Sequence, residues 1–264
     1  MFKRIRHTAV FWKALGGEPN KFKVSIVQNE QQLSEAKELH AAVFLAKGYV
    51  SEADLTSDGK HIGLTEDPYQ THSQYFIVER NHGDTTKVVA SARLILSDER
   101  LGHRSFQTYE HQELLPKYRQ LIERELPSSL AEVSGLVKDR SENTIVTLLL
   151  YRAMWQYSLV TGHRYWLMSC DDRLYKRLKL LFGNTLVEAG KRKFFKGHTV
   201  VPVILDVPYS VHRLLRVARI NPLKRRLQIS LVRFFLAGVD QSVLSDDQKR
   251  QLKRHKVVTR IGTE

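Results

Sequence analysis

In the middle of the chain, two short apolar runs are followed by one long apolar helix pattern, and this order constrains the fold more than any other feature. The runs cover residues 90–94 and 131–136, and each has the length and composition of a buried strand. The helix pattern extends from about residue 143 to Gly162, where a glycine favours a C-terminal stop. Glu132 stands on the second run, ahead of the helix. The order predicts a buried carboxylate close to the junction of a strand and a helix.

The flanking patterns predict a mixed α/β layer in which helices cover both faces of one central sheet. Apolar residues at helical spacing mark 31–47, and the Asn, His, Gly and Asp at 81–84 form a hairpin signal. The predicted elements are, in order, helix 31–47, strands 75–78 and 88–96, a helix within 111–125, strand 130–137, helix 143–162, strand 165–168, a short basic helix 174–182 and strand 200–207.

The length of 264 residues and the hydrophobic fraction of 42% predict one large domain with terminal extensions. We expect a basic N-terminal arm at 1–23, the α/β domain at 24–208 and a basic helical extension at 209–264. Cys170 is the one cysteine, which excludes an internal disulfide and fits a reducing cytoplasm. No run of 18 apolar residues is present, so we expect no spanning helix and a cytoplasmic protein.

The formal net charge is +14, from 42 Lys and Arg against 28 Asp and Glu. Such an excess steers association with acidic partners, which include nucleic acid, anionic lipid and acidic carrier proteins. Residues 207–239 hold seven basic residues and no Asp or Glu, and their spacing predicts amphipathic helices broken near Pro222. Such helices either lie on an anionic membrane, in a membrane-peripheral protein, or pack on the domain with a solvated basic face.

A series of short runs carries a family resemblance over residues 24–208. They are Ala42-Val43-Phe44 with Gly48-Tyr49, Asp67 with Tyr69, His72 and Tyr75-Phe76, Arg93-Leu94, Glu132-Val133-Ser134, and Leu205-Asp206-Val207. In this order they resemble the GNAT N-acyltransferases, and most of all the long-chain N-acyl amino acid synthases and the acyl-homoserine lactone (autoinducer) synthases. The resemblance implies an enzyme that moves a fatty acyl group from a thioester to the amine of an amino acid or similar acceptor.

Two positions depart from the pattern of the lactone synthases. That family carries an Arg directly after its Glu-x-Ser run, where this chain has Gly135. Tyr69 stands near the position of a second expected Asp. Both departures favour a linear N-acyl amino acid as the product. An acyl-homoserine lactone synthase and a lipid-forming ornithine or glycine N-acyltransferase stay open as alternatives.

The loop at 139–144 bears on the acyl donor. Acetyltransferases that use coenzyme A bind its pyrophosphate with a Gly-rich loop at a helix N-terminus. The loop here has no glycine and two carboxylates, which makes it a poor pyrophosphate cradle. An acyl carrier protein presents its thioester on phosphopantetheine, and such carriers are strongly acidic. The loop and the positive charge therefore favour acyl-phosphopantetheine of a carrier protein as donor, with a coenzyme A thioester still open.

The resemblance assigns roles to residues around the second strand. Glu132 is predicted to act as general base, directly or through a water, with an ion pair to Arg93 as the structural alternative. Backbone N–H groups near Gly135 and Leu136, where a bulge is expected, would stabilise the carbonyl charge. Tyr175 would return a proton to the leaving thiolate. The predicted acceptor site consists of Asp67, His72, Arg93 and Ser134, with Gly135 and Leu136 as further substrate contacts.

Aromatic and Met side chains are candidates for an acyl-chain pocket, although such residues at helix or strand spacing more often form plain core. The candidates are Met154, Trp155 and Trp166, together with Phe194 and Phe195.

Metal and nucleotide motifs do not occur in the sequence, and its eleven His form no ligand pair of the His-Glu-x-x-His type. A degenerate acyltransferase fold that binds nucleic acid or an anionic membrane is the non-enzymatic alternative. Nucleic acid is the less favoured partner, because the basic residues lie in amphipathic stretches without the interleaved aromatics of single-strand binders.

Overall fold

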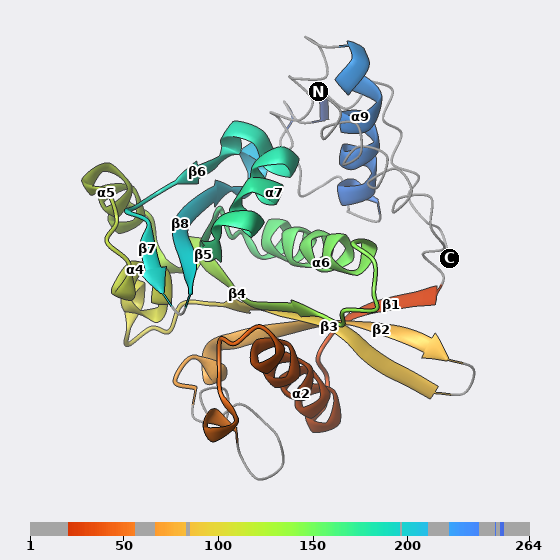
Figure 1. Cartoon of the computed structure of the whole chain (residues 1–264). Coiled ribbons are helices and arrows are strands. Elements are labelled where there is room, and N and C mark those ends of the chain that lie inside the picture. The colour runs from red at the N-terminus through yellow and green to blue at the C-terminus, as the bar shows by residue number, and fades with distance from the viewer. Residues whose placement is uncertain are drawn as a thin grey trace.

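A mixed eight-stranded sheet separates two layers of helices in the computed structural model (Figure 1). The structure describes residues 21–55, 67–82, 85–195, 197–210, 222–237, 246 and 249–250. The strand order is β1-β2-β3-β4-β5-β8-β6, with β7 also paired to β8. The strands are β1 (Phe22–Ile26), β2 (Ser73–His82), β3 (Thr85–Ile95), β4 (Leu130–Lys138), β5 (Tyr165–Asp171), β6 (Leu186–Glu188), β7 (Lys193–Phe195) and β8 (His198–Asp206).

Helix α2 lies on one face of the sheet, and α6 covers the other (Figure 1). The Asn29 side chain caps α2 by accepting a hydrogen bond from the backbone N–H of Gln32 at 2.9 Å. Helix α6 ends at Gly162, whose φ of 83° is left-handed, as its sequence predicts. The helices are α2 (Glu30–Ala46), α4 (Gln107–His111), α5 (Pro116–Arg124), α6 (Ile145–Thr161), α7 (Asp172–Phe182) and α9 (Pro222–Leu236), with short 3-10 turns such as η3 (Gln70–His72).

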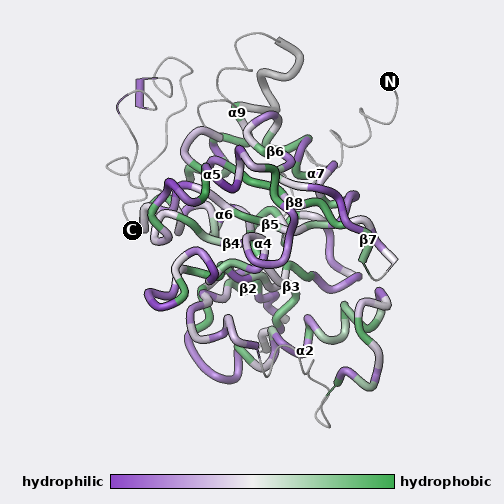
Figure 2. The backbone as a smooth tube through the Cα atoms, turned by 90° about the vertical axis from the view of Figure 1, so that its left-hand side faces the viewer, coloured by the Kyte–Doolittle hydropathy of each residue, from purple (hydrophilic) through white to green (hydrophobic). Residues whose placement is uncertain are grey.

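The main core lies between the sheet and α6. Alternate residues of β3 and β4, such as Leu94 and Val133, point into it and meet the apolar side of α6. Residues on the opposite face of the same strands include Ser91, whose hydroxyl lies 3.5 Å from the carbonyl oxygen of Ala36 in α2. The two sheet faces therefore differ in chemistry, and Figure 2 shows the resulting mixture of hydrophobic and hydrophilic segments along the backbone.

The helix expected within 111–125 is present as α5, and the short helix α4 before it was not predicted. Pro116 takes the first position of α5, where its missing N–H costs nothing. The chain between the two helices is held to the rest of the fold by a bridge between Leu114 and Gly190.

Helix α9 packs its apolar residues against α6. Leu231, Val232 and Phe235 are buried, and the Phe235 ring lies 5.6 Å from that of Trp155 in an edge-on arrangement. Helix α9 thus packs on the domain, which is one of the two predicted alternatives. Residues 211–221 and 238–239 of the same basic segment lie outside the described residues. Among the helices that the structure describes, none has the length and apolar character needed to cross a membrane.

Candidate active site

Strands β4 and β5 separate halfway along their length. Their parallel pairing ends at Glu132 and Leu167, although β4 continues to Lys138 and β5 to Asp171. The register of β4 against β3 also shifts near Gly135, whose φ is 62°. A left-handed residue in a register shift is the signature of a β-bulge, so the bulge predicted at Gly135 is confirmed. The bulge and the separation leave strand backbone uncovered beside Glu132.

Glu132 is buried at this point of separation, with 2% of its surface exposed. Thr108 in α4 supplies both of its hydrogen bonds: the backbone N–H donates to Oε2 and the hydroxyl to Oε1, each at 2.9 Å. Burial raises the pKa of Glu132 from 4.5 to about 7, although the hydrogen bonds from Thr108 and the charge of Arg93 oppose the increase. A carboxyl group with this pKa exchanges protons near neutral pH, as a general base must.

A hydroxyl chain connects Glu132 to the surface. The Thr108 hydroxyl lies 3.0 Å from the hydroxyl of Ser169, which is exposed on β5. When Thr108 donates its proton to Glu132, its oxygen is free to accept the Ser169 proton, so the three groups form a directed relay. The sequence analysis missed both hydroxyls, although Ser169 interrupts an otherwise apolar strand.

Arg93 pairs with Asp67 and not with Glu132. The Arg93–Asp67 ion pair is buried, and the same guanidinium donates to the Tyr75 hydroxyl at 3.2 Å. The predicted Glu132–Arg93 ion pair was wrong, because Arg93 lies opposite Ser134 in the sheet and Glu132 lies opposite Ile95. The charge of Arg93 lowers the pKa of Glu132, but burial outweighs it. The predicted proximity of Asp67, Arg93 and Ser134 is observed.

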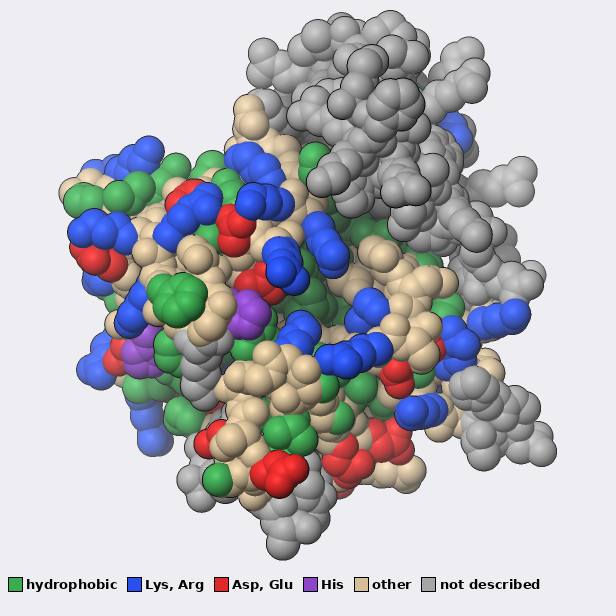
Figure 3. Space-filling view, in the orientation of Figure 1, with side chains coloured by type: hydrophobic (Ala, Val, Ile, Leu, Met, Phe, Trp, Pro, Cys, Tyr) green, Lys and Arg blue, Asp and Glu red, His purple; other side chains and the backbone are tan. Residues whose placement is uncertain are grey.

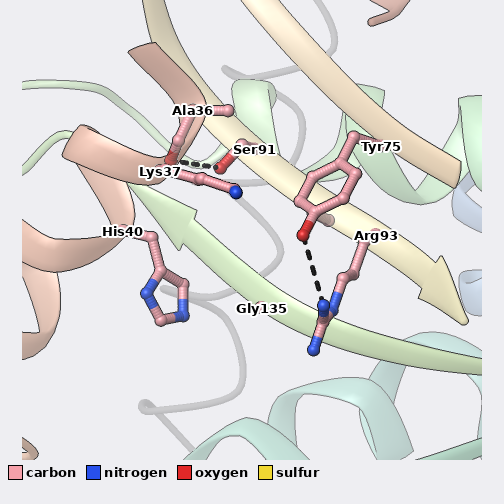
Figure 4. A pocket seen from close by; sticks show the side chains of 8 residues that line it. Ala36, Lys37, His40, Tyr75, Ser91, Arg93 and Gly135 are labelled. Atoms are coloured by element: carbon pink, nitrogen blue, oxygen red, sulfur yellow. Dashed lines mark hydrogen bonds between the residues drawn. The ribbon is translucent and has the colours of Figure 1, made fainter. Parts of the chain in front are cut away.

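A small cavity opens between α2 and the sheet, beside Arg93 (Figure 4). Its volume of ≈ 10 Å³ holds about one water molecule. Figure 4 shows the cationic and imidazole side chains of Lys37, His40 and Arg93 around it, with the Tyr75 ring at one side. Neither Lys37 nor His40 was predicted as a site residue, because the residues that meet them here come from distant strands.

Gly135 forms part of the wall of this cavity. A Cβ atom at this position would lie 3.7 Å from His40 Cδ2 and 3.9 Å from Arg93 Cγ. A side chain at position 135 would therefore grow into the space between these two residues. Arg93 Nε is buried without a hydrogen-bond partner among the described residues, so one donor of the guanidinium is left for a ligand.

The remaining predicted acceptor residue, His72, lies in η3 and does not line the cavity. Its ring meets that of Tyr69 edge-on at 5.8 Å, and the Tyr69 hydroxyl lies 3.3 Å from Nε2 of His111. Leu136 follows the bulge and is half-buried. His72 is therefore close to the Asp67 segment but separate from the cavity around Arg93.

Tyr175 is half-buried in α7, and the Arg192 guanidinium lies 5.6 Å from the centre of its ring. Burial is the largest cause of a raised pKa for Tyr175, which keeps this phenol protonated at neutral pH. A protonated phenol has the proton that a leaving thiolate needs.

The aromatic residues predicted to form an acyl pocket separate into two groups. Met154, Trp155 and Trp166 are buried in the main core, where the Trp166 indole N–H donates to the Ser158 hydroxyl at 2.7 Å. Phe194 and Phe195 lie on β7 with 73% and 55% of their surface exposed. The pocket prediction was wrong for these two, because β7 lies at the margin of the sheet, where only β8 pairs with it.

In the loop at 139–144, where a pyrophosphate would bind, side chains of the loop itself accept hydrogen bonds from backbone N–H groups. Asp139 Oδ1 accepts hydrogen bonds from both the N–H and the hydroxyl of Ser141, and Asn143 Oδ1 accepts from the N–H of Ile145. Lys138 Nζ donates to the carbonyl oxygen of Glu142 at 2.6 Å. Several of the N–H donors that a diphosphate would use are thus satisfied internally. Figure 3 shows Lys and Arg side chains gathered around a hollow in the face where β4 and β5 separate.

The described residues contain no group of three His, Cys, Asp or Glu side chains placed to hold a metal ion. The site brings together a buried carboxyl group, two hydroxyls and a cationic cavity on one face of the sheet.

No protein-family model matches the chain. A search of curated proteins by sequence finds no match.

Solved structures do resemble it. An N-acyl amino acid synthase from uncultured soil microbes, FeeM, aligns with a TM-score of 0.51 and 17% identity over 72% of this chain and 93% of its own. The acyl-homoserine lactone synthase LasI aligns with a TM-score of 0.52 and 16% identity over 70% of this chain and 90% of its own. BjaI is a coenzyme A-dependent acyl-homoserine lactone synthase solved with S-adenosylmethionine and isopentyl-coenzyme A. It aligns with a TM-score of 0.52 and 16% identity over 70% of this chain and 83% of its own. The chain shares the fold of these synthases, and the predicted mixed α/β fold with helices on both faces of one sheet is confirmed.

Proposed function

We propose that this protein is an N-acyltransferase that moves a fatty acyl group from a phosphopantetheine thioester to the amine of an amino acid or similar acceptor. The observation that carries the proposal is Glu132, a buried carboxyl group with a pKa of about 7 where β4 and β5 separate. Resemblance to FeeM and LasI supports it, because the first is named as an N-acyl amino acid synthase and the second as an acyl-homoserine lactone synthase.

The acceptor binds on the α2 side of the sheet. Arg93 and Glu132 lie on the same face, because Arg93 is opposite Ser134 and side chains alternate along β4. Lys37, His40 and Arg93 would contact the polar end of the acceptor, which needs more room than the one-water cavity between them now has, and Asp67 orients the guanidinium. Its amine is then directed toward Glu132.

Transfer proceeds by direct attack. Glu132 takes a proton from the ammonium group of the acceptor, directly or through Thr108 and Ser169. The amine nitrogen bonds to the thioester carbonyl carbon, and the C–S bond breaks as the amide forms. Tyr175 protonates the leaving thiolate, and the second amine proton passes to solvent. Glu132 then releases its proton to solvent and Tyr175 regains one from solvent, so the net products are an amide, a free thiol and one proton.

The developing negative charge on the carbonyl oxygen needs hydrogen-bond donors. Beyond Glu132, β4 no longer pairs with β5, so the backbone N–H groups near Gly135 and Leu136 are candidates for this role. The acyl chain would extend toward α6, where Met154, Trp155 and Trp166 lie, and their part in holding the chain stays a prediction.

An acyl carrier protein is the proposed donor. The loop between β4 and α6 uses its own side chains where a coenzyme A diphosphate would bind, and the net charge of +14 attracts an acidic carrier. Since BjaI is described as coenzyme A-dependent, a coenzyme A thioester is the competing donor.

The decisive experiment supplies purified protein with acyl carrier protein or coenzyme A thioesters of graded chain length. The acceptors are a panel of amino acids and S-adenosylmethionine, and mass spectrometry identifies the products. We expect a linear N-acyl amino acid, formed faster from the carrier thioester. A lactone from S-adenosylmethionine would support the autoinducer synthase alternative. No product from any donor, together with nucleic-acid binding that weakens steeply with salt, would refute the enzyme assignment.

A further inference from the structure

The hairpin of β7 and β8 carries two exposed phenylalanines near its tip. Phe194 and Phe195 are 73% and 55% exposed, and Phe195 pairs with His198 across a two-residue turn that contains Gly197. Consecutive residues of a strand point to opposite faces, so aromatic surface is exposed on both faces of this hairpin. Figure 2 shows the β7 hairpin standing at the margin of the molecule.

The base of the hairpin is firmly held. The N–H of Lys191 donates to the carbonyl oxygen of Glu113 at 2.9 Å, and that of Ala189 to Pro202 at 2.8 Å. A Cβ atom at Gly190 would collide with the Glu113 carbonyl, so only glycine allows this approach. The fold therefore holds the two rings outward on a rigid base, where exposing them costs no ordering entropy on binding.

Basic residues flank the rings in the sequence, and one of them, Lys191, is paired with Glu113. The segment 191–196 contains four Lys and Arg and no Asp or Glu. Arg192 is held by Glu188 and Asp172, whereas Lys193 is exposed between Arg192 and the rings. Aromatic side chains with neighbouring cations are typical of segments that lie at the interface of an anionic membrane.

We propose that the β7–β8 hairpin is a membrane anchor that inserts Phe194 and Phe195 into the interfacial region of an anionic bilayer. A folded protein partner presents a surface that covers one face of a hairpin, whereas fluid lipid surrounds both faces. The observed exposure of rings on both faces therefore favours lipid. This anchor is separate from α9, whose apolar residues are already buried against α6.

The anchor also lies close to the candidate active site. His198 is two residues from Val200, which pairs with Asp171 at the end of β5. The His198 ring meets that of Tyr49, which follows α2, at 4.7 Å. Insertion of the hairpin would bring the end of β5, and the region where β4 and β5 separate, to the lipid surface.

Vesicle co-sedimentation of the full chain tests the anchor and needs no enzymatic turnover. The vesicles are phosphatidylcholine alone and phosphatidylcholine mixed with phosphatidylglycerol. We expect stronger binding to the mixed vesicles, and an at least about tenfold lower partition coefficient for the double variant Phe194→Ser, Phe195→Ser. The matched control is Val160→Ser, Leu180→Ser, which removes apolar residues of 64% and 63% exposure from α6 and α7 and should bind as the unmodified protein does.

A Phe194→Trp variant reports the location of the ring directly. In a Trp12→Phe background, its emission should shift to the blue on the mixed vesicles and be quenched by brominated lipid, because the two remaining native tryptophans, Trp155 and Trp166, are buried and contribute little change. The proposal is overturned if the full chain does not bind the mixed vesicles or if the double variant binds them equally well. Saturable binding of the hairpin to an acidic carrier protein, with no binding to vesicles, would also overturn it.

Discussion

The two faces of the central sheet use the same strands for different purposes. On β3, Leu94 faces the core beneath α6, while its neighbour Arg93 faces α2 and pairs with Asp67. On β4, Val133 and Glu132 divide in the same way. The α6 face gains stability by burying apolar surface, whereas the α2 face keeps charged groups that burial alone would disfavour. Substitutions on the α2 face should therefore lower turnover, whereas those on the α6 face should lower stability alone.

The largest effect is expected for Glu132→Gln. Gln has the same shape and keeps an oxygen for the N–H of Thr108, but it cannot accept a proton. We expect turnover to fall by about 10²–10⁴-fold, the usual contribution of a general base, with the fold retained. Steady-state kinetics and circular dichroism measure the two quantities. Unchanged turnover would exclude Glu132 as the base.

Breaking the buried ion pair tests the charged face further. Arg93→Met leaves Asp67 buried without its partner and should lower the free energy of unfolding by about 3–5 kcal/mol. The double variant Arg93→Met, Asp67→Leu removes both charges and should recover most of that stability without recovering activity. Urea unfolding and acylation assays together separate the two roles. Recovered activity in the double variant would show that the pair serves stability alone.

Leu94→Ala provides the matching substitution on the α6 face. Leu94 is fully buried, so its truncation should cost about 2–5 kcal/mol of unfolding free energy through lost burial and a new cavity. The folded fraction should retain normal turnover per molecule, because Leu94 points away from Glu132 and the α2 side. A large loss of turnover at full folding would mean that the two faces are coupled more tightly than their contacts indicate.

Local pattern was sufficient to predict the elements with one strong periodic signal. The apolar periodicity of α6, its stop at Gly162 and the glycine bulge in β4 were all predicted, because each depends on residues close together in sequence. Glu132 was recognised because a carboxylate in an apolar strand is rare and needs a reason.

The residues that contact Glu132 could not be predicted from local sequence patterns. Thr108 is separated from Glu132 by 24 positions and from Ser169 by 61, and nothing in its own neighbourhood marks it. The Arg93 ion pair was misassigned for the same reason, since the choice between Asp67 and Glu132 depends on the register of β3 against β4. Exposure of Phe194 and Phe195 depends on where β7 ends in the sheet, which composition does not reveal.

The two faces of the sheet should also differ in how the unfolding free energy depends on pH, and this effect should be smaller than those of the preceding substitutions. Folding raises the pKa of Glu132 from 4.5 to about 7, so between these values the folded state binds more protons than the unfolded state. The contribution of Glu132 to the unfolding free energy should therefore fall as pH rises from about 4.5 to 7, by an amount on the order of 3 kcal/mol. Glu132→Gln should flatten the dependence of the unfolding free energy on pH. Leu94→Ala should lower the unfolding free energy equally at every pH and leave that dependence unchanged. Equal slopes in the unmodified protein and Glu132→Gln would contradict the raised pKa.

The smallest and most specific effect is expected for Thr108→Val. Valine keeps the shape and the backbone N–H but removes the hydroxyl that donates to Glu132 and accepts from Ser169. Because that hydrogen bond lowers the pKa of Glu132, its loss should raise the pKa and move the midpoint of the pH–rate profile above about 7. Thr108→Ser keeps the hydroxyl and should restore the original midpoint. A lower rate with an unmoved midpoint in Thr108→Val would mean that Thr108 contributes packing to the α2 side and takes no part in the proton path.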